Sequence, residues 1–388
     1  MNRKISRRKA LQGTLAAAVG WGFLGTRRAW AGPPAEILEI KIISHQKDLY
    51  HGWPTVTRCR NGQLLLVYSG GREEHVCPFG RVEMMRSADE GRTWGWPCVL
   101  MDTEIDDRDA GVLETPRGAI LVTTFTSLAY ERVLGRIERS SPSGGEPDRL
   151  RRWQAAHRRL SAEQRKALLG EWMLRSTDGG ATWSAPYRVP LNSPHGPFAL
   201  HDGRLLYAGK ELWHGNERNG VCQSTDDGQT WPWLAEIPTR PGDRRQNYHE
   251  LHGVETSGGR IVVQIRNNNP NNNEETLQTH SLDGGKTWAE PYTIGVWGLP
   301  SHLLRLKDDR LLMTYGHRRP PYGVQARISE DEGRHWSEPI LISQDGIDDD
   351  LGYPSSVQLS DGALLTVWYE VMKDNPRAVL RQARWKLV

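Results

Sequence analysis

Six times along the chain, a short turn built around Gly or Asp is followed by a run of apolar residues. Most successive turns lie 50 to 56 residues apart, and one interval is 85 residues long. Each interval has room for two hairpins, that is, for a four-stranded antiparallel sheet. The turns are Asn61-Gly62, Arg117-Gly118, Asp202-Gly203, Gly258-Gly259, Asp308-Asp309 and Asp361-Gly362. The pattern predicts six sheets of similar size.

The segment from Glu36 to Ser44 also alternates apolar and polar residues, which is typical of a strand with one buried face. It can complete the sixth sheet and join the two ends of the chain, and such a closed ring leaves no long sheet edge exposed. We therefore expect residues 32–388 to form one all-β domain, a six-bladed β-propeller.

The long interval contains an insertion, residues 131–171, with a different composition. Its stretch from Leu150 to Leu169 is rich in Arg, Ala, Leu, Gln and Glu, and Ser161-Ala-Glu-Gln164 fits a helix capping box. This predicts a helical insertion in the second blade. A solvated helical hairpin on the rim and a lid or partner-binding element are both compatible with the pattern.

The first 31 residues have the pattern of an export signal. The basic segment Ser6-Arg7-Arg8-Lys9-Ala10-Leu11 comes first. An apolar stretch from Leu15 to Leu24 follows, and then a small-residue cleavage site at Ala29-Trp30-Ala31. The apolar stretch is short for a bilayer span. We expect residues 1–31 to be a cleaved twin-arginine signal peptide, and the twin-arginine export machinery to carry the folded chain to the periplasm or beyond. No membrane span is expected after cleavage.

The formal charge of the full chain is +3, but this value depends on the signal. The signal contains seven basic residues and no acidic one, so the remainder has 43 Lys and Arg against 47 Asp and Glu. This balance gives no indication of a nucleic-acid partner. The Cys residues follow no metal-ligand spacing, and we expect no cofactor.

A second repeat, S-x-D-x-G-x-T/H-W, occurs five times. In such a turn Asp accepts backbone N–H bonds, Gly adopts a positive φ, and Trp inserts between sheets. The copies are Ser87–Trp94, Ser176–Trp183, Ser224–Trp231, Ser281–Trp288 and Ser329–Trp336. This pattern is the Asp box, and it resembles that of the sialidase (neuraminidase) superfamily of β-propellers. The box belongs to the scaffold and does not identify a substrate.

The six turns give the units a common register. Nine positions before the turn stand Trp53, Asp109, Pro194, Glu250, Pro300 and Tyr353. Three of these residues, Asp109, Glu250 and Tyr353, carry groups suited to catalysis, and the first strand of each blade faces the propeller axis. We therefore expect these three side chains to converge there.

Basic residues and histidines flank this register. Arg108, His195, His249 and His302 stand close to it in the chain. We expect them to bind substrate, with the imidazoles hydrogen-bonding to sugar hydroxyls. Converging imidazoles can also ligate zinc or copper, but no two of them form a tight metal motif, so we predict no metal site.

The resemblance to sialidases implies a specific chemistry. In that family a tyrosine nucleophile is activated by a glutamate, three arginines bind the substrate carboxylate, and an aspartate is the general acid and base. The segment Tyr353-Pro-Ser-Ser-Val-Gln-Leu-Ser-Asp361-Gly362 is similar to the tyrosine segment, and the segment from Glu250 to Arg266 is similar to that with the glutamate and one arginine. The resemblance therefore implies catalytic Tyr353 and Glu250, with Arg266 binding substrate.

Other positions depart from the family pattern. Gly52 stands where the first arginine is expected, and Arg318 lies a few residues before the third position. The acid/base loop offers Glu74 or His75 in place of an aspartate, and Arg72 or Arg108 can supply the missing charge.

Three functions are compatible with this sequence. The leading hypothesis is an exo-acting glycoside hydrolase that removes a terminal acidic sugar, sialic acid or a related one, from a glycan by a retaining Tyr/Glu mechanism. The first alternative is a hydrolase or lyase of the same fold that acts on uronic-acid or other non-sialic glycans through a His/Glu pair, with His75, His195 or His249. The second alternative is a non-catalytic carbohydrate-binding propeller.

Overall fold

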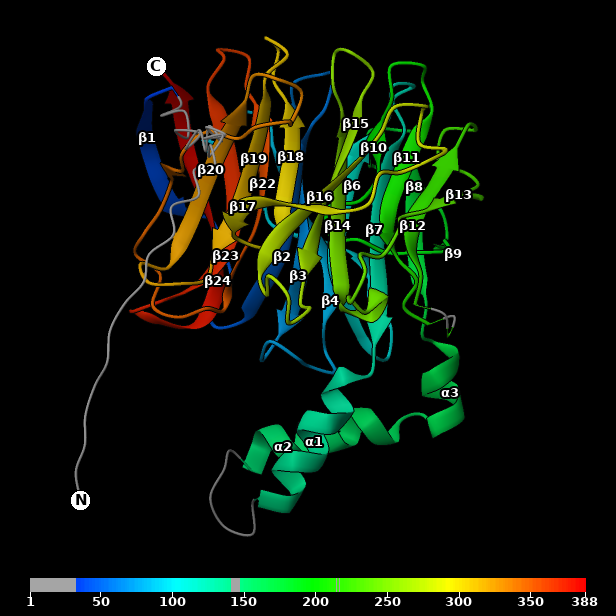
Figure 1. The fold of residues 1–388 in the computed structure, drawn as a ribbon. Coiled ribbons are helices and arrows are strands. Elements are labelled where there is room, and N and C mark those ends of the chain that lie inside the picture. Colours follow the sequence, from blue (N-terminus) through cyan, green and yellow to red (C-terminus); the bar gives the residue numbers. More distant parts are fainter. Residues whose placement is uncertain (1–32, 141–146, 214, 216) are drawn as a thin grey trace, which may run out of the picture.

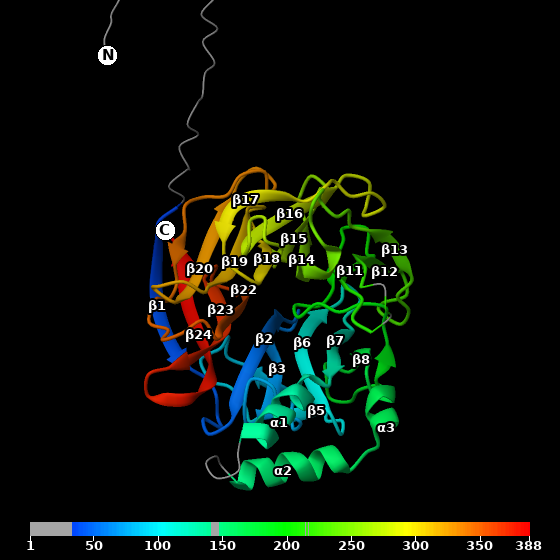
Figure 2. The same ribbon diagram turned by 60° about the horizontal axis from the view of Figure 1, so that its bottom comes forward.

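The computed structural model describes residues 33–140, 147–213, 215 and 217–388. Within these ranges, six four-stranded antiparallel sheets surround a central axis (Figures 1 and 2). The predicted six-bladed β-propeller is confirmed. The signal peptide predicted for residues 1–31 lies outside the described residues.

Blades one to five each use four consecutive strands, beginning with the inner one. They are β2 (Tyr50–Arg58), β3 (Leu64–Arg72), β4 (Arg81–Ser87) and β5 (Cys98–Met101) in blade one; β6 (Asp106–Glu114), β7 (Ile120–Ser127), β8 (Glu171–Ser176) and β9 (Tyr187–Arg188) in blade two; β10 (Phe198–Ala199), β11 (Leu205–Lys210), β12 (Asn219–Ser224) and β13 (Trp233–Glu236) in blade three; β14 (Tyr248–Glu255), β15 (Ile261–Asn267), β16 (Glu275–Ser281) and β17 (Tyr292–Trp297) in blade four; and β18 (Ser301–Arg305), β19 (Leu311–His317), β20 (Gly323–Ser329) and β21 (Ile340–Leu341) in blade five. A short 3-10 helix, Arg245–Asn247, precedes β14.

Blade six joins the two ends of the described chain. It consists of β22 (Leu351–Gln358), β23 (Leu364–Met372), β24 (Asn375–Leu387) and the N-terminal β1 (Ala35–Ile42). The β1 strand pairs with β24 from Ala35 opposite Leu387 to Ile42 opposite Arg381. The closing strand predicted from the N-terminal alternation is therefore present, and backbone hydrogen bonds close the ring.

Apolar residues fill the space between neighbouring blades. Between blades one and six, Leu66 and Tyr68 pack in one buried cluster with Leu365 and Tyr369. Similar clusters join the other neighbouring blades. The core is therefore divided among the blade interfaces, which leaves the axis free for polar side chains.

The Asp boxes link adjacent blades. In the first copy, the Ser87 hydroxyl donates to Asp89 Oδ1 at 2.8 Å, and that oxygen accepts the Thr93 N–H at 2.9 Å. The Trp94 indole then donates to Gln382 of blade six at 2.7 Å. Each box follows the third strand of its blade, so the boxes lie on one face of the propeller, called the box face below.

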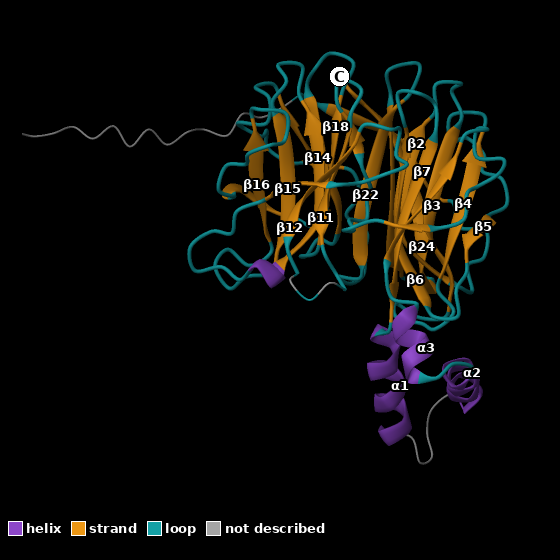
Figure 3. Ribbon diagram, turned by 90° about the vertical axis from the view of Figure 1, so that its right-hand side faces the viewer, coloured by secondary structure: helices purple, strands orange, loops and turns teal. Residues whose placement is uncertain are grey.

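The opposite face carries the insertion, and is called the insertion face. Helices α1 (Ala129–Ser140), α2 (Pro147–Arg158) and α3 (Ala162–Ala167) lie between β7 and β8 of blade two, beyond the ends of the strands (Figure 3). The helical insertion in the second blade is confirmed, and Ser161 and Gln164 form the expected capping box. The inner strands of the blades begin at this same face. None of the helices described is both long and apolar enough to cross a membrane.

Candidate active site

Four inner strands have a bulge at the same level, close to the insertion face. The pairing register between the first and second strands shifts there in blades one, two, four and six. Each bulge contains a non-Gly residue with positive φ: Trp53 at 54°, Asp109 at 50°, Glu250 at 45° and Tyr353 at 51°. These are four of the six positions that the turn spacing aligned. Such conformations are strained for L-residues and concentrate at functional sites.

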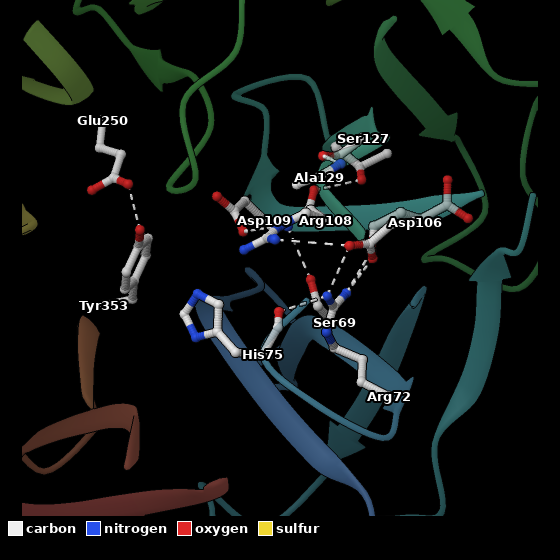
Figure 4. Close-up of polar contacts among 12 residues, drawn as sticks. Ser69, Arg72, His75, Asp106, Arg108, Asp109, Ser127, Ala129, Glu250 and Tyr353 are labelled. Carbon is white, nitrogen blue, oxygen red and sulfur yellow. Dashed lines mark hydrogen bonds and ion pairs between the residues drawn. The ribbon is translucent and has the colours of Figure 1, made fainter. Parts of the chain in front are cut away.

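Tyr353, Glu250 and Arg266 form a hydrogen-bonded cluster, called the tyrosine side below. The Tyr353 hydroxyl donates a short hydrogen bond to Glu250 Oε1 (Figure 4). Arg266 Nη1 donates to both Glu250 oxygens, at 2.9 and 2.8 Å, and lies 3.4 Å from the phenol oxygen. The structure thus brings together the three residues on which the resemblance depends.

The protonation states within this cluster are well separated. Burial, together with the Glu250 charge, raises the pKa of Tyr353 well above its ordinary value. Burial also raises the pKa of Glu250, but the charge and hydrogen bonds of Arg266 outweigh it and hold that pKa below its ordinary value. At neutral pH the pair is therefore a neutral phenol that donates to a carboxylate, the arrangement in which the carboxylate can accept the phenol proton.

Trp53 is at the centre of a second group, called the tryptophan side. The guanidinium carbons of Arg72 and Arg108 lie 4.9 and 4.3 Å from the centre of its ring. Arg72 donates to Asp106 at 2.5 and 2.9 Å, and both side chains are fully buried. The prediction that Arg72 binds substrate is therefore corrected, because Asp106 of blade two neutralises its charge between blades one and two.

Asp109 lies beside Arg108, with Nε of Arg108 3.8 Å from Asp109 Oδ1. Its own N–H donates to the Ser69 hydroxyl at 2.9 Å, which anchors the bulge. Burial raises the pKa of Asp109 to about 7, Arg108 partly opposes this shift, and the negative charge of Glu250 adds to it. Asp109 is therefore a carboxyl group that still carries its proton in mildly acidic solution.

The loop after β3 brings His75 to the site and holds Glu74 elsewhere. His75 Nδ1 lies 2.9 Å from both the Tyr50 hydroxyl and Asp350 Oδ1, and its ring packs edge-on against Trp53 at 4.9 Å. The Trp53 ring that it contacts has its centre 6.3 Å from that of Tyr353. Burial lowers the pKa of His75, although Asp350 opposes this shift.

Glu74 is bound by two arginines. It accepts a short hydrogen bond from Arg149 of α2 and a second from Arg377 of β24 at 2.6 Å. Of the two acid/base candidates on this loop, the structure places only His75 against Trp53.

Aromatic side chains occupy the position of the expected first arginine. A Cβ atom added to Gly52 would lie 3.0 Å from the ring of Tyr50 and 3.9 Å from that of Tyr369. Both tyrosines donate to Asp350, at 3.0 and 3.1 Å. This space is therefore filled, and a longer side chain at Gly52 requires Tyr50 to move.

Arg318 is the cation that remains available near Tyr353. Its guanidinium carbon lies 5.8 Å from the centre of the Tyr353 ring, and its Nε donates to the Leu351 carbonyl at 3.0 Å. No carboxylate of the described chain forms an ion pair with it, whereas the adjacent Arg319 pairs with Glu274 at 3.6 Å. Arg318 is therefore suited to bind an anionic substrate group.

The histidines predicted to bind substrate divide into two groups. His249 is half-buried beside Glu250, and burial, together with the Lys210 charge, lowers its pKa to about 4. His195 and His302 pack with His252, at ring-centre distances between 4.5 and 5.3 Å. This trio lines a pocket of about 290 Å³ with residues from the later parts of the inner strands, toward the box face.

His195 is the member of the trio closest to the tyrosine side, with its ring centre 6.4 Å from that of Tyr353. Burial lowers the pKa of His302 to about 3 and those of His195 and His252 well below their ordinary values, so the trio is neutral. Among the described residues, no group of three His, Cys, Asp or Glu side chains is arranged to hold a metal ion.

Sequence reasoning missed Tyr50, Tyr369 and Asp350, which hold His75 in place. Asp350 ends the run Asp348-Asp349-Asp350, which has the composition of a solvated loop. Tyr369 lies in an apolar strand where a core role is the ordinary expectation. No motif distinguishes these residues, because their role depends on contacts between blades one and six.

A six-bladed propeller with Asp boxes on one face and a buried Tyr–Glu–Arg cluster near the other is a scaffold of the sialidase superfamily. Residues 150–366 match the family model of the BNR repeat-like domain, which is more than half of the chain, and the chain belongs to this family.

Individual relatives are distant. The chain is 25% identical over 356 residues to a sialidase from Bacteroides fragilis. The matched region covers 82% of this chain and 59% of that protein. It is 29% identical over 174 residues to the xyloglucanase Xgh74A from Acetivibrio thermocellus, which covers 39% of this chain and 20% of that one. The chain thus spans less than two thirds of the length of these curated relatives.

A solved structure from Dyadobacter fermentans, of a protein of unknown function, resembles the whole propeller. Its TM-score is 0.73 at 22% identity, over 91% of this chain and 99% of that chain. This likeness supports the fold.

Proposed function

We propose that this chain is an exo-acting glycoside hydrolase that removes a terminal acidic sugar, sialic acid or a related one, from a glycan with retention of configuration. The observation that carries the proposal is the hydrogen bond from the buried Tyr353 phenol to Glu250, with Arg266 bound to the same carboxylate. The similarity to a sialidase, at 25% identity, supports the same class of reaction.

The first step forms a bond between the Tyr353 oxygen and the anomeric carbon. Glu250 accepts the phenol proton, and the bond to the leaving-group oxygen breaks as Asp109 gives that oxygen a proton. Two carboxyl groups whose surroundings shift their pKa values in opposite directions are suited to divide the roles of base and acid. Glu250, with a lowered pKa, is the base, and Asp109, with a raised pKa, is the acid.

The second step releases the sugar. The Asp109 carboxylate takes a proton from a water molecule, whose oxygen attacks the anomeric carbon while the bond to Tyr353 breaks. The proton on Glu250 returns to the phenol oxygen, so both groups regain their starting states. Arg318 holds the carboxylate of the sugar, and His249 binds a hydroxyl group.

A second candidate is a hydrolase or lyase that acts on uronic-acid glycans. The favouring observation is the contact between His75 Nδ1 and Asp350, which leaves Nε2 as the ring nitrogen for proton transfer. Paired with Glu250, His75 can serve hydrolysis or β-elimination. Elimination yields an unsaturated uronic sugar that absorbs ultraviolet light, whereas hydrolysis yields no such chromophore.

The test incubates the purified mature chain with sialosides and with uronic-acid oligosaccharides. Released sugar and ultraviolet absorbance are followed in parallel, for the wild type, for Tyr353→Phe and for the control Tyr292→Phe on outer strand β17. We expect acidic sugar to be released, and Tyr353→Phe alone to lower turnover at least about 100-fold while remaining folded. Full activity of Tyr353→Phe would contradict the nucleophile, and an absorbing product would favour the second candidate. Saturable binding with no turnover would favour a non-catalytic propeller.

We also propose export by the twin-arginine machinery, which the Arg7-Arg8 pair supports. Replacing both arginines by lysine is expected to retain the full-length chain in the cytoplasm, measured by cell fractionation and immunoblotting. Unchanged export of that variant would contradict the proposal.

A further inference from the structure

The helical insertion differs in charge from the rest of the molecule. Residues 129–169 contain ten Lys and Arg and five Asp and Glu. The remainder of residues 33–388 contains 33 Lys and Arg and 42 Asp and Glu. A basic segment is therefore attached to an acidic propeller. An approaching polyanion is repelled by most of the molecule and attracted to the insertion.

Most of this positive charge is on the surface. Among the described helices, the small apolar core consists of Tyr130, Leu134 and Trp153, packed against Cys77 and Ile105 of blade one and its loops. The exposed basic residues are Arg132, Arg136, Arg139, Arg151, Arg152, Arg158, Arg159 and Lys166. The apolar residues account for the packing, so the excess of basic residues calls for a separate explanation.

Helix α2 is tied directly to the loop that carries His75. The Trp153 indole donates to Glu73 at 2.8 Å, Arg152 donates to the other Glu73 oxygen at 2.8 Å, and Arg149 donates to Glu74. The basic helix therefore lies on the insertion face, next to the loop that carries His75. A ligand of α2 would lie close to a substrate bound at the candidate active site.

Beside these contacts, α2 and blade one line a pocket of about 730 Å³. Its lining includes Phe79, Asp102, Glu104, Arg152 and Arg159. Carboxylates accept hydrogen bonds from sugar hydroxyls, guanidinium groups donate to sugar carboxylates, and an aromatic ring can pack on the apolar face of a sugar. The pocket has the chemistry and the size for one or two sugar units.

We propose that the insertion binds an acidic stretch of the glycan on the leaving-group side of the cleaved bond. The substrate class is then an acidic oligosaccharide or polysaccharide with several negative charges, and not a neutral chain that ends in one acidic sugar. This inference rests on the proposed function for its link to turnover. Binding itself can be measured without turnover.

The experiment measures binding of polysialate, polygalacturonate and neutral dextran to the Tyr353→Phe protein by titration calorimetry. The test variant adds Arg158→Glu and Arg159→Glu, and the matched control adds Arg92→Glu and Lys286→Glu, two exposed residues of Asp boxes on the box face. At low salt we expect the test variant to bind at least one acidic polymer about tenfold more weakly, and the control to change about twofold or less. The difference should shrink as salt is added.

Several results would overturn the inference. The first is a Tyr353→Phe protein that binds neither acidic polymer. The second is an equal loss of affinity in the test and control variants. The third is binding of dextran as tight as that of the acidic polymers. Binding to phosphatidylglycerol vesicles without binding to either polymer would assign the basic surface to a lipid membrane. If acidic polymers bind as expected but the wild type cleaves nothing, only the proposed function fails. If the wild type cleaves sialosides but binds no polymer, only this inference fails.

Discussion

The tyrosine side and the tryptophan side of the site share one backbone feature, but their side chains have different roles. In both, an inner-strand bulge gives a non-Gly residue a positive φ, as at Tyr353 and Trp53. On the tyrosine side the hydrogen bonds of Glu250 and Arg266 meet at one phenol oxygen. On the tryptophan side Arg72 is paired with a buried carboxylate beneath an indole ring.

This difference indicates how the scaffold separates chemistry from support. Charges that point at one titratable group control its proton, whereas charges that neutralise each other between two blades, as Arg72 and Asp106 do, contribute shape and stability. Asp109 interacts with both groups. It lies on the tryptophan side, beside Arg108, yet the negative charge of Glu250 on the tyrosine side helps to raise its pKa. The comparison therefore predicts that variants of the two sides differ in the property that they change.

The largest expected effect is on stability and comes from the tryptophan side. Asp106→Asn leaves the buried Arg72 guanidinium without its counter-ion, so we expect the free energy of unfolding to fall by about 3–5 kcal/mol. Tyr353→Phe removes the hydrogen bond to Glu250 and a long one from Arg266, but Glu250 keeps both of its bonds from Arg266, so the cost is expected to be about 1 kcal/mol. Urea unfolding of both variants at neutral pH measures the contrast.

Asp148→Asn is the matched control, because Asp148 forms an exposed ion pair with Arg151. Its effect should stay within about 1 kcal/mol. If Asp106→Asn is as mild as this control, the tryptophan side is not a structural support.

Much of the fold could be predicted because the propeller repeats its signals. The six Gly and Asp turns gave the number of blades, and the alternation from Glu36 to Ser44 predicted β1. The spacing from each turn also aligned Trp53, Asp109, Glu250 and Tyr353. A constant number of residues between turn and bulge is a property of the chain itself, so it is visible in the sequence.

The partners of charged side chains could not be predicted in the same way. Arg72 and Arg318 are both arginines close to the expected site, yet one is buried against Asp106 and the other has no carboxylate partner among the described residues. Glu74 and His75 are adjacent, and contacts with α2 and β24 decide which of them reaches Trp53. These outcomes depend on distant segments. The positive φ values were equally hidden, because no residue type marks them.

An intermediate effect is expected at Asp109 and depends on pH. Its pKa is about 7 in the folded chain against an ordinary value near 3.8, so the folded state favours the protonated form. Ionisation therefore destabilises the fold progressively as pH rises from about 4 to above 7. Asp109→Asn removes this penalty. Relative to the wild type, we expect its stability to improve between pH 4 and pH 8 by on the order of 2–4 kcal/mol.

Asp350→Asn should show the opposite sign. Burial raises the pKa of Asp350, but its hydrogen bonds with His75, Tyr50 and Tyr369 hold that pKa below its ordinary value. Its stabilising effect is therefore present at neutral pH and is lost as pH falls through the folded pKa. The Asp350 effect therefore changes below about pH 4, so unfolding curves for both variants from about pH 2 to pH 8 test the pair of signs. Parallel profiles would contradict the opposite pKa shifts of Asp109 and Asp350.

The smallest expected effect concerns the cation near Tyr353. Arg318→Lys keeps the positive charge but loses the fork of donors that suits a carboxylate, so we expect KM for an acidic sugar to rise about tenfold with little change in kcat. Arg319→Lys is the adjacent control, since Arg319 already pairs with Glu274, and its KM should not change. Steady-state kinetics on one acidic glycoside measures both variants. Equal KM values for the two variants would mean that the substrate carboxylate is held elsewhere, and Arg108 on the tryptophan side would then be the residue to test next.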